Sequence, residues 1–200
     1  MAGSIESLMI INKSGGLIYH KEFNNDANSK PRLSSNEMLV FAGTLHGAYT
    51  IASRLKPKAI QLKNDSSYNI NANTAPRVPY VPGLGVNQCS GTTFKAPDFF
   101  SESFPSWNKT GIKQIETDDF TMYCYQTLTG VKFIMVTLPH SWVNGLQQPI
   151  SVADNILRKV YCLYSDYVMK SPFYSLEMPI KNDIFDKKLK SFIASLQRDF

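Results

Sequence analysis

The sequence has few of the residues from which disulfide frameworks and metal sites are built. Only three of its 200 residues are cysteine, at Cys89, Cys124 and Cys162, and none belongs to a C-x-x-C pair. An odd number of cysteines without that spacing argues against both a disulfide framework and a zinc site. We therefore expect no metal ion and no cofactor.

Motifs that bind nucleotides or nucleic acids are also missing. Gly83-Leu84-Gly85 lacks the third glycine and the strand–helix setting of a dinucleotide site, and there is no P-loop. The net charge is +5, and most of the excess is spread thinly between Lys56 and Lys113. Scattered charges of this kind are more typical of a solvated loop than of a phosphate-binding stripe, so we expect no nucleic-acid partner.

Residues that could perform catalysis have simpler structural explanations. His46 lies in a helical segment that is otherwise free of charge, where a neutral buried histidine is the more common finding. Cys124 and Cys162 fall within a predicted strand and a predicted helix, as small buried hydrophobic residues do. Asp118 and Asp119 lie at a predicted bend, where turn formation explains them more simply than acid–base chemistry. The sequence thus predicts no active site and no enzyme.

The first ten residues lack the features of a secretory signal peptide. They contain no basic stretch and no long apolar core. We expect a cytoplasmic protein that reaches membranes only peripherally, through a complex.

The segment Ser34–Leu55 organises the rest of the chain. Ser34 and Glu37 form an S-x-x-E capping box, which predicts a helix start, and Pro57 follows its end. Between Glu37 and Arg54 there is no charged residue. A helix that is apolar on all sides is buried on both sides or crosses a membrane, and this one is too rich in small and polar residues to cross. One side should therefore meet the chain's own sheet and the other a second subunit.

The two sides of this helix differ in bulk. Gly43 and Gly47 lie one turn apart and allow close approach of a backbone, so we expect their side, with Leu39 and Ile51, to pack on the chain's own sheet. The bulky stripe is then left as the predicted partner interface, comprising Met38, Phe41, Leu45 and Tyr49.

The order of predicted elements is ββαβββαα in a single domain covering residues 1–200. A hairpin bends at Asn12–Gly16, and regular structure resumes at Ile112 with three strands and then two helices. Residues 57–110 lose all periodicity and are predicted to form an irregular insertion. This order indicates an α+β fold, with one five-stranded antiparallel sheet and helices packed on it.

Four segments resemble the synbindin-type subunit of the TRAPP vesicle-tethering complex, in a match of fungal character. They are NKSGGLIY, LSSNEMLVFAGTLHGAYTIASRL, YQTLTGVKF and LRKVYCLYSDYVMKSPFYSLEMPI. The resemblance covers about two thirds of the chain and implies a longin-like (SNARE-like) fold of the same ββαβββαα order. Residues 57–109 do not match motif by motif. Mammalian members carry a PDZ-like insertion where this chain has a short connector, so that module's function is not carried over.

The resemblance implies a non-catalytic core subunit of TRAPP. Its expected partners are other TRAPP subunits, above all a second longin-like subunit, and a Rab GTPase whose nucleotide exchange the complex promotes. Its expected location is peripheral, on the cis-Golgi and on vesicles from the endoplasmic reticulum. The alternative is a longin-type adaptor that binds a SNARE or coat protein without a role in exchange. A small hydrolase is a third class, which the missing nucleophile–base pair disfavours.

Overall fold

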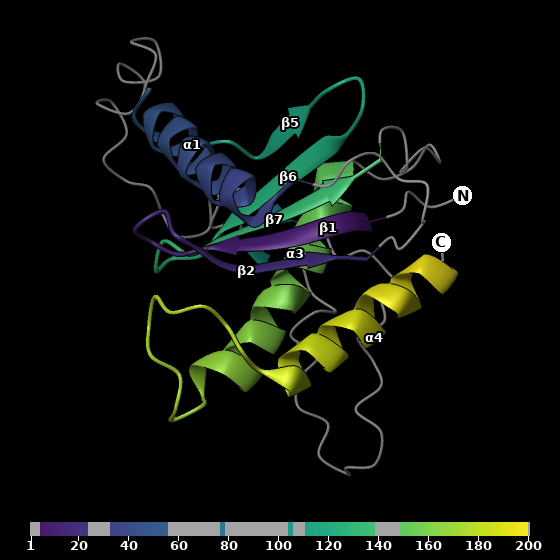
Figure 1. Cartoon of the computed structure of the whole chain (residues 1–200). Coiled ribbons are helices and arrows are strands. Elements are labelled where there is room, and N and C mark those ends of the chain that lie inside the picture. The colour runs from purple at the N-terminus through teal and green to yellow at the C-terminus, as the bar shows by residue number, and fades with distance from the viewer. Residues whose placement is uncertain are drawn as a thin grey trace.

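The structure is a computed structural model, and one antiparallel sheet lies at its centre (Figure 1). It describes residues 5–23, 33–55, 77–78, 104–105, 111–138 and 149–199. The sheet has the strand order β2-β1-β7-β6-β5, so β2 and β5 form its two edges. A single helix covers one face, and two helices cover the other. The predicted α+β longin-like fold is confirmed.

The hairpin at the N-terminal side forms as predicted, with β1 (Ile5–Ile11) and β2 (Leu17–Glu22) joined by the Asn12–Gly16 turn. The side-chain oxygen of Asn12 accepts a hydrogen bond from the Gly16 amide at 2.7 Å. Gly15 adopts a φ of +95°, a conformation that favours glycine because it has no Cβ. Local turn chemistry therefore sets the hairpin.

The three later strands also form in the predicted order. They are β5 (Gln114–Glu116), β6 (Thr121–Gln126) and β7 (Lys132–Thr137). β7 pairs with β1, so the first strand of the chain is an inner strand, between β2 and the central strand β7. The bend between β5 and β6 is closed by the Thr117 hydroxyl group, which donates to the Phe120 carbonyl at 2.7 Å.

Helix α1 (Ser35–Arg54) starts at the predicted capping box. The Glu37 amide donates to Ser34 Oγ at 3.3 Å, and the Ser34 amide donates to Glu37 Oε2 at 2.7 Å. Its buried residues pack on one face of the sheet, against Met9, Ile11 and Ile134. This arrangement forms the smaller of two hydrophobic cores.

The larger core lies on the opposite face, under two helices. α3 (Pro149–Tyr164) runs directly into a π-helical turn, η2 (Ser165–Met169), and α4 (Asp183–Asp199) follows a loop. Phe133 of β7 meets the rings of Tyr161 and Tyr164 edge-on, with centroid distances of 6.0 and 5.5 Å. The predicted pair of C-terminal helices is confirmed.

The predicted irregular insertion, residues 57–110, is described only in part. Two short strands, β3 (Arg77–Val78) and β4 (Phe104–Pro105), pair with each other in antiparallel fashion. The rest of that prediction lies outside the described residues.

Candidate functional site: an uncharged helix face

The bulky stripe of α1 faces the chain's own sheet, which corrects the predicted orientation. Met38, Leu45 and Tyr49 are 8%, 8% and 3% exposed, and Phe41 is half-buried against the same core. Large side chains are needed to fill the space between a helix and a sheet, and each contributes about 1.5–3 kcal/mol when buried. In this structure the four residues are therefore part of the monomer's own packing.

The opposite side of α1 faces outward and carries no charge between Glu37 and Arg54. We call it the α1 outer face, and it comprises Leu39, Val40, Gly43, Gly47 and Ile51. A Cβ atom added at Gly43 or Gly47 would meet nothing within 4 Å. Leu39, Val40 and Ile51 are 53%, 70% and 64% exposed. At Gly43 and Gly47 the helix backbone is therefore uncovered, between exposed apolar side chains.

Polar side chains along the helix do not make this face hydrophilic. The Thr44 hydroxyl group donates to the Val40 carbonyl at 2.9 Å, and the Thr50 hydroxyl group donates to the His46 carbonyl at 2.8 Å. Both hydroxyl groups thus donate their hydrogen bonds to carbonyl groups within α1, as Ser and Thr commonly do in helices. An exposed, uncharged and apolar surface of this kind is typical of a protein-binding site.

A second exposed apolar surface lies in the Ser171–Lys181 loop, between η2 and α4. Phe173 is 95% exposed, and Leu176 and Met178 are 67% and 58% exposed. The loop is nevertheless attached to the hairpin turn, because Ser14 Oγ donates to Glu177 Oε1 at 2.9 Å. Glu177 has a φ of +72°, which is strained for a non-glycine residue. The loop therefore displays apolar side chains from an anchored backbone.

His46 and Lys132 form a polar contact beneath α1. His46 Nδ1 lies 3.2 Å from Lys132 Nζ, and this ammonium group also donates to the Gly130 carbonyl at 3.3 Å. Burial, and then the charge of Lys132, lower the pKa of His46, so the imidazole is neutral and accepts the hydrogen bond. A Cβ atom on Gly15 would lie 3.0 Å from the His46 ring, so the hairpin turn packs on the helix here. His46 is thus only half-buried, where a buried histidine was predicted, and its imidazole ring lies between the hairpin turn and Lys132.

The remaining candidates for chemistry do not assemble into a site. Burial raises the pKa of the Cys124 thiol to about 12, and burial also raises that of Cys162. Asp118 and Asp119 are exposed at the bend between β5 and β6. Among the described residues, no group of three or more His, Cys, Asp or Glu side chains could hold a metal ion. Cys89 and His140 lie outside the described residues.

None of the described helices is both long and apolar enough to span a bilayer.

Comparison with known proteins identifies the family. The model of the Sybindin-like family matches residues 5–196. Trafficking protein particle complex subunit 4 of Homo sapiens is 32% identical over 161 residues, which cover 80% of this chain and 48% of the human protein. The Dictyostelium discoideum subunit 4 is 30% identical over 191 residues, covering 96% of this chain and 97% of that protein. Subunit 1 of Rattus norvegicus is 26% identical over 107 residues, covering 53% and 68% respectively.

The chain thus spans about half the length of the human relative and nearly all of the Dictyostelium one. The family match extends over both cores and both edges of the sheet. On these grounds the chain belongs to the Sybindin-like family.

Proposed function

We propose that this chain is a non-catalytic core subunit of a TRAPP vesicle-tethering complex, and that a second subunit binds the α1 outer face. The relatives named as particle-complex subunits support the first part. The uncharged outer face of α1 is the single observation that supports the second. A partner helix or strand can approach closely where Gly43 and Gly47 leave the backbone bare.

The α1 outer face is too small to hold a partner by itself. Leu39, Val40 and Ile51 together contribute at most about 4.5–9 kcal/mol when fully buried, at about 1.5–3 kcal/mol each. Association costs about 4–15 kcal/mol in lost freedom of motion. The face is therefore insufficient by itself. We take the edge strand β5 as its extension, because Ile115 of β5 packs against the hydrophobic core that α1 covers.

The proposed role in the complex is architectural. As part of TRAPP, the chain would pair with a second longin-like subunit and help form the surface that promotes nucleotide exchange on a Rab GTPase. It would work in ER-to-Golgi traffic, peripherally on cis-Golgi membranes and vesicles, and carry no active site of its own. The isolated chain exposes the α1 outer face, so we expect it to self-associate when expressed alone.

Co-expression and an exchange assay test this proposal. The chain should purify as a 1:1 heterodimer with a second longin-like subunit, and the full complex should release nucleotide from its Rab faster than the same complex lacking the chain. A stable, monodisperse monomer that joins no other subunit would contradict the proposal. A chain that joins a SNARE or coat protein, with exchange unaffected by its loss, would identify the adaptor alternative instead.

A further inference from the structure

The edge strand β2 has backbone groups that point away from the sheet. The Phe23 amide donates to the Glu6 carbonyl of β1 at 2.9 Å, and Lys21 and Tyr19 lie opposite Leu8 and Ile10 in the same register. In antiparallel strands, hydrogen-bonded pairs alternate with non-hydrogen-bonded pairs. Tyr19 and Lys21 are in hydrogen-bonded pairs with β1, so His20 between them directs its N–H and C=O away from β1, toward the open side of the edge. Within the described residues, no backbone group forms a hydrogen bond with the outward N–H or C=O of His20.

One end of this edge already receives an extended segment. The Ile180 amide, at the end of the Ser171–Lys181 loop, donates to the outward carbonyl of Ile18 at 2.8 Å. His20 is the next residue along β2 that faces the same way. Outward N–H and C=O groups of an edge strand are a template for pairing with another chain.

A groove of about 800 Å³ runs beside this edge, between α1 and α4. Leu39 of α1 contributes one wall and is 53% exposed. Ala194 of α4 is exposed on the other wall, above the buried Ile193. Successive side chains of a strand point to opposite faces. A strand added to β2 would therefore direct alternate side chains to the α1 wall and to the α4 wall.

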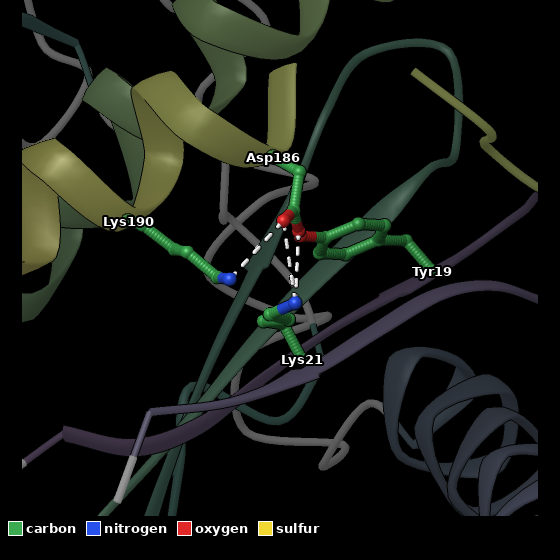
Figure 2. A network of polar contacts seen from close by, with 4 residues as sticks. All are labelled: Tyr19, Lys21, Asp186 and Lys190. Atoms are coloured by element: carbon green, nitrogen blue, oxygen red, sulfur yellow. Dashed lines mark hydrogen bonds and ion pairs between the residues drawn. The ribbon is translucent and has the colours of Figure 1, made fainter. Parts of the chain in front are cut away.

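The α4 wall is held in place by a polar network (Figure 2). Asp186 of α4 accepts hydrogen bonds from Tyr19 Oη at 2.8 Å and from Lys21 Nζ at 3.2 Å, and Lys190 Nζ lies 3.5 Å from the same carboxylate. Two ammonium groups, of Lys21 and Lys190, thus share the single carboxylate of Asp186. Glu22 lines the same groove but lies on the α1 side of β2, by its register opposite Ser7.

We propose that β2 accepts an extended segment of another protein chain, which pairs with the backbone of His20. Its apolar side chains would contact Leu39 and the exposed Ala194, and a carboxylate would lie near Lys190. The inference rests on the proposed function, because the donor of the segment is a fellow subunit of the complex. The chain's own connector, residues 24–32, matches the apolar walls poorly, since only Ala27 and Pro31 in it are non-polar.

Amide hydrogen exchange, resolved to single residues by fragmentation, tests this pairing. We expect the His20 amide to exchange rapidly in the free chain and about tenfold or more slowly in the purified complex, while the Tyr19 and Lys21 amides stay slow in both. Unchanged exchange at His20 in an intact complex would overturn the inference and leave the proposed function standing. A slow His20 amide in the free chain would also overturn it, because the chain's own residues would then cover the edge. Failure of the chain to assemble would overturn both.

Matched proline variants give a second measurement. His20→Pro removes the outward N–H, which an edge strand tolerates, so circular dichroism should be unchanged while affinity for the complex falls about tenfold. Tyr19→Pro removes an N–H that pairs with β1 and should unfold the hairpin. Ala194 is exposed on α4, so Ala194→Arg should fold and block the groove with a long side chain. This variant tests the inference if His20→Pro fails to fold. Wild-type affinity for both His20→Pro and Ala194→Arg would disprove the inference.

Discussion

His46 on α1 and Lys132 on β7 are in direct contact, with Nδ1 and Nζ 3.2 Å apart. Burial, and then the charge of Lys132, lower the pKa of His46 in the folded chain below its ordinary value of 6.5. The unfolded chain therefore binds a proton more readily. Stability from this group is complete above about pH 6.5, the unfolded value, and is lost as the pH falls toward the folded pKa.

We expect the free energy of unfolding, measured with urea, to fall as the pH is lowered from 7.5 to 5.5. In His46→Gln the slope of the unfolding free energy against pH should be smaller over that range, because the titrating group is gone. An equal slope in His46→Gln and wild type would show that other groups control the dependence.

Aspartate placed on the two sides of α1 should have opposite effects. Leu45→Asp buries an unpaired carboxylate in the core and should cost about 3–5 kcal/mol, enough to unfold the chain. Ile51→Asp places the same group on the exposed outer face, so the fold should persist while assembly with the partner subunit is lost. Circular dichroism and gel filtration of both variants measure the difference.

The reverse outcome would be equally clear. If Leu45→Asp folds and fails only to assemble, while Ile51→Asp unfolds, then the helix is rotated relative to the arrangement described above.

Gly47 allows a test that adds bulk rather than charge. Gly47→Ala meets open space and should stabilise the isolated chain by about 1 kcal/mol through helix propensity. Gly47→Leu should also fold, because nothing lies within 4 Å of the new Cβ. It should weaken partner binding, because the leucine side chain would cover the helix backbone that the partner approaches. Thermal melts and pull-down of the partner separate the two effects, and equal binding by Gly47→Leu and wild type would place the partner elsewhere.

The Asp186 network should stabilise the fold above acidic pH. Burial raises the pKa of Asp186, but hydrogen bonds from Tyr19 and Lys21 and the charges of Lys21 and Lys190 outweigh this effect, so its pKa lies below the ordinary value. A carboxyl group with a lowered folded pKa contributes stability above its unfolded pKa of about 3.9, and the contribution is lost as the pH falls through the folded value.

Asp186→Asn should therefore destabilise the chain by about 1 kcal/mol at pH 7, because the network is partly exposed and partly screened. The difference from wild type should shrink below about pH 3.5. Tyr19→Phe is the matched control, since it removes one hydrogen bond and keeps both lysine contacts. Denaturant unfolding at the two pH values measures all three proteins, and a constant difference would show that the charge of Asp186 has no part in it.

Features set by neighbouring residues could be predicted from the sequence. Ser34 and Glu37 are three residues apart, and Asn12 and Gly16 are four apart, so the capping box and the hairpin turn follow from local chemistry alone. The strands and the last two helices followed from their periodicity in the same way.

The orientation of α1 could not be obtained that way. Both of its sides lack charge, so hydropathy did not distinguish them, and glycine permits close packing without requiring it. The deciding fact is the volume between helix and sheet, which Leu45 and Tyr49 fill. Contacts such as that between Tyr19 and Asp186, 167 residues apart in the chain, are set by the tertiary arrangement and leave no trace in local pattern.

The inner position of β1, between β2 and β7, has a consequence for synthesis of the protein. Ile5 of β1 pairs with Thr137 of β7, so the inner edge of the first hairpin has no partner strand until more than a hundred further residues have been made. At about 5–20 residues per second, that interval is roughly 7–25 seconds. During this time an apolar strand, Ile5–Ile11, is exposed on the nascent chain. The chain is therefore most in need of chaperones early in its own translation, well before any partner subunit can bind it.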